Sequence, residues 1–253
     1  MVIYRVIIAL FITTSLIGQH MCGVCPSVDT IKPCKCVTKA GNKTHIVCGG
    51  NTALDLKNVF ERFSKELQTN GSADDKHFDL FDLKHNKITE LADNTFADIS
   101  FNAIHIEAKA LTTVRRNAFA GQRGVRRLTI TETPVTDSQL FPSIGAMIGL
   151  THLQIIATEL TQIPGNCFDL LTDLREIKLN ENTGLKRINS RAFVGLPSVD
   201  TIHLDLNNIR HIDDQAFLAH LNEKVYGNFL RYNPFNSIGL ATIDCTDCRN
   251  AWL

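Results

Sequence analysis

The chain has 253 residues, enough for one large domain or two small ones with a substantial buried core. Its 26 basic and 26 acidic residues balance, so the formal net charge is zero. Because a protein that binds duplex nucleic acid usually carries a basic excess for phosphate contacts, this balance argues against a nucleic-acid partner. The eight cysteines are unevenly placed, with five of them in the first 48 residues.

The N-terminus is typical of a secretory signal peptide. Arg5 is the only charge before the apolar run VIIALFITTSLIG, residues 6–18, and this run is shorter than the about 20 residues that span a bilayer. Small and polar residues follow it, which places cleavage between residues 15 and 23. We therefore expect residues 1–21 to be removed and the chain to be secreted; the alternative is a buried N-terminal strand. No later stretch of the sequence is apolar enough to cross a membrane.

A cysteine cluster follows the signal segment. Its spacing is C-x8-C-x-C-x11-C, formed by Cys25, Cys34, Cys36 and Cys48, while Cys22 falls in the cleavage region. Cysteines of a secreted chain form disulfides, and a zinc site is the competing use. The secreted context and the C-x-C spacing favour disulfides.

The segment after the cluster combines two glycosylation motifs with a predicted helix. Asn42 in NKT and Asn70 in NGS lie in polar, loop-like surroundings, so we expect both to accept a glycan. Between them, LDLKNVFERFSKEL at residues 54–67 places its apolar residues on one helical face. This pattern predicts a helix that connects the cysteine cluster to the rest of the chain.

A repeat begins at Phe78 and continues through the rest of the chain. FDLFDLKHNKITELADNTFADI places apolar residues at positions 1, 4, 6, 11, 14, 19 and 22, with asparagine at position 9. The same template fits again from Phe101, Val125, Leu150, Leu174, Val199 and, more loosely, Val225. The starts are 23, 24, 25, 24, 25 and 26 residues apart. This period and pattern are those of leucine-rich repeats, about seven of them over residues 78–240.

The positions of the repeat predict a solenoid with parallel strands. Positions 1–6 alternate as in a short strand, so positions 4 and 6 point inward while positions 3 and 5 point outward. The apolar residue at position 14 and the phenylalanine at position 19 close the core from the convex side. Because one repeat cannot bury its apolar side alone, the repeats stack and their strands line a concave wall. The fold class is therefore an α/β leucine-rich repeat solenoid.

Asparagine at position 9 is expected to satisfy backbone groups in the turn after each strand. Asn86, Asn182, Asn207 and Asn233 keep this residue, whereas Lys109, Thr133 and Thr158 replace it. Threonine can make part of the same hydrogen bonding, but lysine can only donate. The third repeat also departs from the template, and TDSQLFPSIGAMIG at residues 136–149 predicts an irregular or short helical convex segment. These deviations either mark a functional surface or reflect drift in a tolerant repeat.

The cysteine cluster in front of this array resembles the cysteine-rich N-terminal cap of extracellular leucine-rich repeat proteins. In that cap the first cysteine pairs with the third and the second with the fourth. The resemblance therefore implies the bonds Cys25–Cys36 and Cys34–Cys48. Loops of this length each stabilise a fold by about 3 kcal/mol on the chain-entropy model. The cap and its helix are expected to occupy residues 22–77.

Motifs for catalysis do not occur in the sequence. It contains no nucleophile elbow, phosphate loop or H-E-x-x-H, so we expect neither an enzyme activity nor a cofactor. The outward residues at position 5 are Asp82, His105, Thr129, Gln154, Lys178, His203 and Phe229. Such a column is a mixed surface typical of binding, without an acid/base pair. His105 and His203 are four repeats apart, so they cannot share a metal ion.

The C-terminal half of the concave wall is the predicted site for a protein partner. Lys178, His203 and Phe229 lie there at position 5, and Tyr226 and Tyr232 belong to the same half. Aromatic residues are favoured at the hot spots of interfaces.

A second hypothesis is a patch for a sulfated glycan or an acidic partner, suggested by the five arginines of VRRNAFAGQRGVRRL. Arg115 and Arg116 follow position 14 on the convex side, whereas Arg126 and Arg127 occupy strand positions 2 and 3. The two pairs are therefore expected to face different ways, which argues against a single patch.

IDCTDCRNAWL closes the chain at residues 243–253. Cys245 and Cys248 before a tryptophan resemble the start of the cysteine-flanked C-terminal cap of leucine-rich repeat proteins. Because a solenoid exposes its core at each end, we expect residues 241–253 to be a partial, truncated cap of a chain that continues beyond Leu253. A redox C-x-x-C would instead be expected at a helix N-terminus in a thioredoxin-like setting. A bond between the two cysteines is the other alternative.

The resemblance narrows further. CPSVDTIKPCKC, the helix before the first repeat, repeat ends of the type NTFADI and the terminal AWL are similar to arthropod secreted proteins related to the non-catalytic subunit of oplophorus-luciferin 2-monooxygenase. This resemblance implies a non-enzymatic accessory protein that binds or stabilises a partner, not light emission. The alternative is the ectodomain of an adhesion or innate-immune receptor, whose anchor would lie downstream of Leu253.

Overall fold

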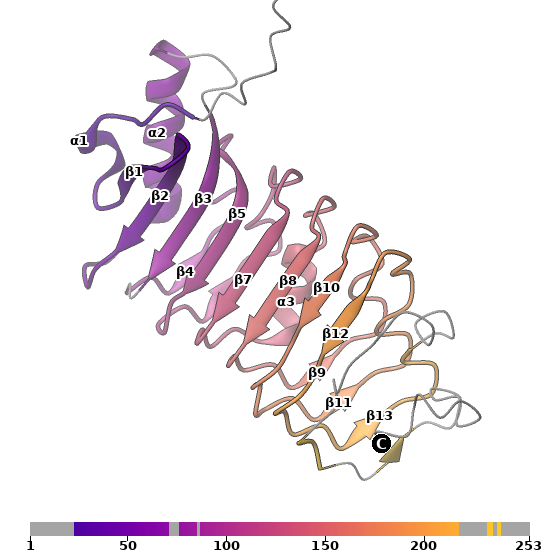
Figure 1. Cartoon of the computed structure of the whole chain (residues 1–253). Helices are drawn as coiled ribbons and strands as arrows, with labels where there is room; N and C mark the ends of the chain where they lie inside the picture. The colour runs from indigo at the N-terminus through magenta and orange to yellow at the C-terminus, as the bar shows by residue number, and fades with distance from the viewer. Residues whose placement is uncertain (1–22, 71–75, 85–86, 218–231, 235–236, 239–253) are drawn as a thin grey trace, which may run out of the picture.

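The computed structural model describes residues 23–70, 76–84, 87–217, 232–234 and 237–238, and these residues form a curved stack of coils (Figure 1). An eight-stranded sheet in the order β1-β2-β3-β5-β7-β8-β10-β12 lines the concave side. Shorter elements lie on the opposite, convex side, and the apolar core fills the space between them. The predicted leucine-rich repeat solenoid is confirmed.

Each of the first six repeats contributes one strand to the concave wall. The strands are β3 (His77–Lys84), β5 (Ser100–Glu107), β7 (Arg127–Thr131), β8 (His152–Ile156), β10 (Glu176–Lys178) and β12 (Thr201–His203). Neighbouring strands pair in parallel at matching repeat positions, as Phe81 with Ile104 and Ile177 with Ile202. These inward residues are buried, as the alternation predicts. Most of the seventh repeat, from Val225, lies outside the described residues.

Short strands occupy the convex side in two groups. β4 (Glu90–Leu91) pairs with β6 (Thr113–Val114), and a second group contains β9 (Gln162–Ile163), β11 (Arg187–Ile188), β13 (His211–Ile212) and β14 (Ser237–Ile238). The phenylalanines at position 19, or at position 20 in the fifth repeat, stack from coil to coil beneath them. The ring centroids of Phe168 and Phe193 are 5.6 Å apart, and those of Phe193 and Phe217 are 4.9 Å apart. These rings close the core from the convex side.

Helix α3 (Asp137–Ile144) separates the two groups of convex strands, within the segment predicted to be irregular or helical. Its Phe141 fills the place of the missing position-19 ring and packs edge-on against the ring of the next repeat. Gln139 Oε1 accepts a hydrogen bond from the N–H of Val114 in β6 (3.4 Å). Asp137 Oδ1 accepts one from the N–H of Thr161, just before β9 (3.0 Å). Side chains of the helix thus replace the backbone bonds that a convex strand would make to both neighbouring coils.

The N-terminal cap adds a hairpin to the sheet. After the short helix α1 (Val28–Ile31), β1 (Lys35–Lys39) pairs antiparallel with β2 (Lys43–Gly49), and β2 pairs in parallel with β3. Disulfides join Cys25 to Cys36 and Cys34 to Cys48. This is the pairing that the resemblance to extracellular caps implies.

Helix α2 (Leu56–Asn70) confirms the helix predicted over residues 54–67. It begins after Asp55, whose carboxylate accepts a hydrogen bond from the N–H of Asn58 (3.0 Å) and so caps the first turn. Its buried Phe60 contacts Phe81 and Phe96 of the first coil, with ring centroids 5.5 and 5.2 Å away. The helix therefore seals the N-terminal end of the solenoid core with aromatic rings.

The position-9 asparagines connect one coil to the next. Asn182 is fully buried, and its Oδ1 accepts a hydrogen bond from the N–H of Thr158 in the preceding coil (2.8 Å). Its Nδ2 donates to the carbonyl oxygens of Ile155 and Leu179 (2.9 and 2.8 Å). Its own N–H donates to Oδ1 of Asn207 in the following coil (2.7 Å). One amide side chain thus bonds backbone groups in two coils.

Where asparagine is replaced, part of this hydrogen bonding between coils is kept. Thr133 Oγ1 accepts from the N–H of Ala108 (3.0 Å) and donates to the carbonyl of Thr131 (2.8 Å). Lys109, which has no acceptor, is exposed and forms an ion pair with Glu132 (2.9 Å). Asn86 lies outside the described residues. Threonine therefore makes part of the asparagine hydrogen bonds, as expected, whereas lysine pairs with a carboxylate instead.

We predict that Asp137→Ala destabilises the protein by about 1–3 kcal/mol, because the N–H and the hydroxyl of Thr161 both lose a partly buried hydrogen bond, each worth about 0.5–1.5 kcal/mol. Asp137→Asn keeps a carbonyl oxygen and should cost clearly less. Urea unfolding of both variants measures the difference. Equal stability of the alanine variant and the wild type would show that the helix does not bridge the coils through this side chain.

Candidate functional site

The strand register aligns the outward side chains into columns. Position 5 gives the column Asp82, His105, Thr129, Gln154, Lys178 and His203, all of them half-buried. Position 3 gives Leu80, Ala103, Arg127, His152, Glu176 and Thr201 on the same face of the sheet. We call these two columns the concave surface. Because backbone hydrogen bonds hold the strands, the surface is broad and its side chains are fixed in relative position.

The C-terminal half of the concave surface carries a compact charged group on three adjacent strands. Lys178 Nζ lies 2.9 Å from Glu176 Oε1 within β10. His152 of β8 is directly opposite Glu176, and His203 of β12 is directly opposite Lys178. We call these four residues the β10 cluster.

Glu176 remains ionised within this cluster. Burial opposes its ionisation, but the hydrogen bond and charge of Lys178, with further contributions from His152 and His203, bring the pKa of the carboxyl below its ordinary value of 4.5. The cluster therefore presents fixed charges of both signs to a partner at neutral pH. Such an arrangement favours a partner with a matching pattern of charges and hydrogen-bonding groups.

The N-terminal half of the concave surface contains an acid/base pair that the sequence reasoning excluded. His105 Nδ1 lies 2.8 Å from Asp82 Oδ1, and Lys84 Nζ lies 3.6 Å from Asp82 Oδ2. The expectation of a column without such a pair was wrong. Position-5 residues of adjacent coils face each other across about 4.8 Å of sheet, so residues 23 apart in sequence become direct neighbours.

His105 also faces a hydroxyl on its other side, with Nε2 at 3.5 Å from Thr131 Oγ1. Acid, base and hydroxyl then follow one another as in a nucleophilic triad, but a working nucleophile–base bond is about 2.6–3.2 Å long. The pockets described below are lined by other residues. Among the described residues, no three or more His, Cys, Asp and Glu side chains gather where a metal ion could bind. The geometry fits a polar contact surface better than a catalytic centre.

Only some of the predicted partner-binding residues lie in the part of the chain that the structure describes. Lys178 and His203 are direct neighbours in the sheet, whereas Tyr226 and Phe229 lie outside the described residues. Tyr232 is 75% exposed with a backbone φ of 61°, and Leu206, at the same repeat position, is 45% exposed with a φ of 58°. Both lie in turns, and Leu206 follows β12. Tyr232 therefore belongs to the rim of the concave surface rather than to a strand of the wall.

His152 and Glu176 were missed as candidate site residues. The alternation of the strand places position 3 on the same face as position 5. Following position 3 from repeat to repeat would have found both residues. The charges around these two residues could not be predicted from the sequence, because they depend on which strands are adjacent.

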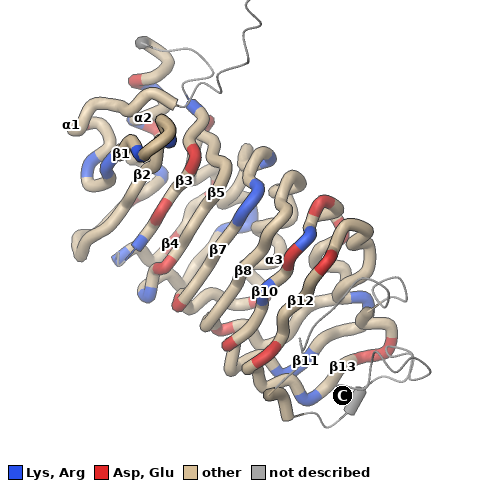
Figure 2. The backbone as a smooth tube through the Cα atoms, in the orientation of Figure 1, with Lys and Arg blue, Asp and Glu red and all other residues tan. Residues whose placement is uncertain are grey.

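The arginine-rich segment does not form one basic patch. Arg115 pairs with a glutamate of β4 on the convex side (2.6 Å), and Arg126 reaches Asp173 (3.7 Å). Arg127 lies on the concave surface. Figure 2 shows Lys and Arg mixed with Asp and Glu along the strands. The arginines face different ways, as expected from their repeat positions.

The two glycosylation motifs lie near the N-terminal cap. Asn42 is exposed in the turn of the β1–β2 hairpin. Asn70 is the last residue of α2. Helices in the described part of the chain are too short or too polar to span a bilayer.

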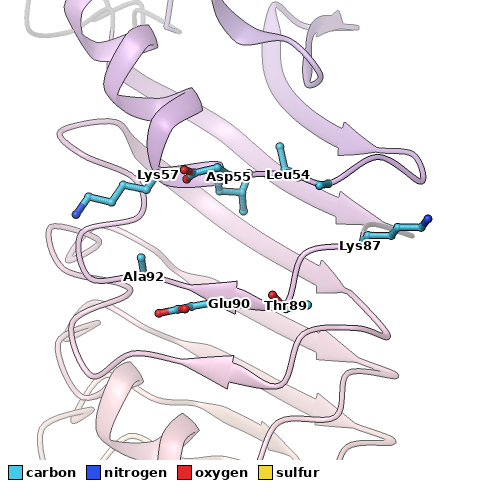
Figure 3. A pocket seen from close by; sticks show the side chains of 9 residues that line it. Leu54, Asp55, Lys57, Lys87, Thr89, Glu90 and Ala92 are labelled. Atoms are coloured by element: carbon cyan, nitrogen blue, oxygen red, sulfur yellow. The ribbon is translucent and has the colours of Figure 1, made fainter.

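Two pockets lie away from the concave surface. One, with a volume of about 490 Å³, is lined by residues 53–57 before and at the start of α2 and by residues around β4 (Figure 3). The other, of about 410 Å³, lies beside α3 and is lined by Arg116, Phe141 and Cys167, among others. Burial raises the pKa of the Cys167 thiol well above its ordinary value. This cysteine is therefore a neutral packing residue.

We predict that the stability cost of Glu176→Gln depends on pH. Because the pKa of Glu176 is lower in the folded than in the unfolded chain, its ionised form stabilises the fold above the ordinary value of 4.5. This contribution is lost as the pH falls through the lowered pKa. The cost, measured by urea unfolding, should shrink between pH 7 and about pH 3. A cost that stays constant or grows on acidification would contradict the assignment.

Comparison with known proteins agrees with this geometry. A family model described as the BspA type leucine rich repeat region matches residues 89–224 in six copies. The structure of Toll from the Drosophila Toll–Spatzle complex matches with a TM-score of 0.51 and 20% identity, over 74% of this chain and 23% of that chain. Human 5T4 matches with a TM-score of 0.50 and 17% identity, over 86% and 83% of the two chains.

A further match is TLR13 in its ssRNA13 complex, with a TM-score of 0.49 and 16% identity, over 75% of this chain and 33% of that one. The chain thus spans a third or less of the TLR13 and Toll chains. At these identities the solved structures share the fold alone. The six matched repeat copies cover more than half of the sequence. The chain belongs to the leucine-rich repeat family, in its BspA type.

Proposed function

We propose that this protein is a secreted, non-enzymatic scaffold that binds a protein partner on its concave surface. The observation that carries the proposal is the β10 cluster, in which Glu176 and Lys178 present opposite charges from one strand. His152 and His203 lie beside them on the two neighbouring strands. A rigid sheet with charged, half-buried side chains suits recognition of another folded protein, since the groups that bind are already ordered.

The fold gives this proposal indirect support. The Toll structure was determined in a complex with Spatzle, so a solenoid of this kind can hold another protein. The asparagine ladder and the continuous core make such a scaffold stiff. Neighbouring coils support each other, and the wall they form offers an extended surface.

Secretion is supported by the covalent structure of the cap. Its two disulfides form and persist in oxidising compartments such as the extracellular space. We propose residues 1–21 as a signal peptide, 22–77 as the cap, 78–240 as the repeats and 241–253 as the start of a C-terminal cap. Asn42 and Asn70 are the proposed glycan acceptors, and the exposure of Asn42 suits that role.

The partner is proposed to be a protein that needs a non-catalytic companion. This finer proposal rests on the resemblance to arthropod proteins related to the non-catalytic subunit of oplophorus-luciferin 2-monooxygenase. An ectodomain of an adhesion or innate-immune receptor is the second candidate, favoured by the fold shared with Toll. Sequencing the native transcript beyond codon 253 separates the two, because only the receptor encodes a membrane segment or lipid anchor there.

We predict that Lys178→Glu combined with His203→Ala weakens binding of a partner captured from native secretions. Reversing one charge of the β10 cluster and removing its neighbour should reduce affinity by roughly tenfold or more, as at the centre of an interface. Affinity is measured by surface plasmon resonance with the captured partner. Thermal unfolding of the double variant checks that the fold is intact.

A matched pair on the convex side serves as the control. Lys186→Glu with His211→Ala changes the same residue types, both exposed, on the opposite face of the solenoid. This control variant should bind as tightly as the wild type. Unchanged affinity of the Lys178/His203 variant would remove the proposal for this half of the concave surface.

A further inference from the structure

The first coil leaves one edge of the convex strands open. The N–H groups of Thr113 in β6 and of Arg115, directly after it, donate to backbone carbonyl oxygens of the preceding coil (3.1 and 2.9 Å). Glu90 and Ala92 occupy the matching positions of the first coil. Their strand, β4, is paired with β6 on one side and with no described strand on the other. Their N–H groups therefore point away from β6, toward the N-terminal cap.

The cap does not complete this edge. In the part of the chain that the structure describes, neither the Glu90 nor the Ala92 N–H has a backbone acceptor. Elsewhere on the convex side a vacant edge is filled, since Gln139 and Asp137 of α3 bond the two edges that flank the helix. A strand edge with free N–H groups is a template for pairing with another extended chain.

The open edge borders the pocket of about 490 Å³. Figure 3 shows residues Leu54 and Asp55 on one side of the space and β4, with Thr89 and Glu90, on the other. We call this pocket the β4 groove. An added strand would lie about 4.8 Å from β4, on the side where the groove lies.

The charges of the β4 groove that are free to bind a ligand are positive. The carboxylate of Asp55 caps α2, and that of Glu90 is held by Arg115 (2.6 Å). Lys57 and Lys87 line the groove and have no ion-pair partner among the residues that the structure describes. They lie toward opposite ends of β4 (Figure 3). The groove thus combines backbone donors with two available ammonium groups.

We propose that the β4 groove binds an extended acidic segment of a partner protein as an added strand. Backbone carbonyl oxygens of the segment accept hydrogen bonds from the N–H groups of Glu90 and Ala92, as in other cases of strand addition. Acidic side chains of the segment contact Lys57 and Lys87. This site is on the convex side, so it is independent of the proposed function of the concave surface.

The probe is a fluorescein-labelled, amidated hexapeptide of alternating valine and aspartate, measured by fluorescence anisotropy with the full chain. The same peptide with lysine in place of aspartate is its matched control and should bind more weakly. Replacing Lys57 and Lys87 together by glutamine should weaken binding of the acidic peptide by roughly threefold to tenfold. Replacing Lys39 and Lys43, exposed lysines of the cap hairpin, should leave it unchanged.

Amide hydrogen exchange separates strand addition from attraction by charge alone. The acidic peptide should slow exchange at Glu90 and Ala92 by about tenfold or more and leave Arg115, which is already bonded, unaffected. Binding without this protection, equal binding of the lysine peptide, or no binding at about 1 mM peptide would each overturn the proposal.

Discussion

In the turns that follow β5, β8, β10 and β12, backbone N–H groups donate hydrogen bonds to polar side chains of the next coil. Asn182 shows the constraint most completely, because it accepts from Thr158 of the preceding coil and donates to carbonyl oxygens of both coils. Buried backbone groups without partners cost about 1–3 kcal/mol each. Where position 9 keeps a side chain that accepts hydrogen bonds, as at Thr133, Asn182 and Asn207, that side chain bonds the backbone of the preceding coil.

The same constraint explains the irregular third repeat. Helix α3 interrupts the convex strands, yet its Gln139 and Asp137 accept hydrogen bonds from the N–H groups that a strand would have bonded. Its Phe141 packs edge-on against Phe168 of the next repeat. The coils on either side keep their spacing, so the concave sheet continues without a break through β7 and β8. Continuity of the sheet is what brings Glu176, Lys178 and the two histidines of the β10 cluster into fixed positions. The candidate site is thus a consequence of coil stacking rather than of any local motif.

Much of this fold could be predicted from the sequence, because burial follows periodicity. The inward positions of each strand, the helix of the cap and the irregular convex segment were all found from apolar spacing, and the disulfide pairing followed from a resemblance. The Asp82–His105 pair was missed because it joins residues of different coils, and a list of one column does not show which side chains touch. The bridging role of Asp137 was likewise not predictable, because its carboxylate takes the place of a backbone carbonyl as the acceptor of the Thr161 N–H. Sequence periodicity therefore predicts where a side chain points, whereas its partners depend on register.

Stability of the Asn182→Ala variant tests the central claim, that position-9 side chains hold neighbouring coils together. The variant leaves the N–H of Thr158 and the carbonyl oxygens of Ile155 and Leu179 without their partner. We expect a loss of about 2–4 kcal/mol in the free energy of unfolding by urea. Asn189→Ala removes an amide whose Nδ2 donates to Gln162 on the convex side, and it should cost less than about 1 kcal/mol. Equal losses in the two variants would contradict the account.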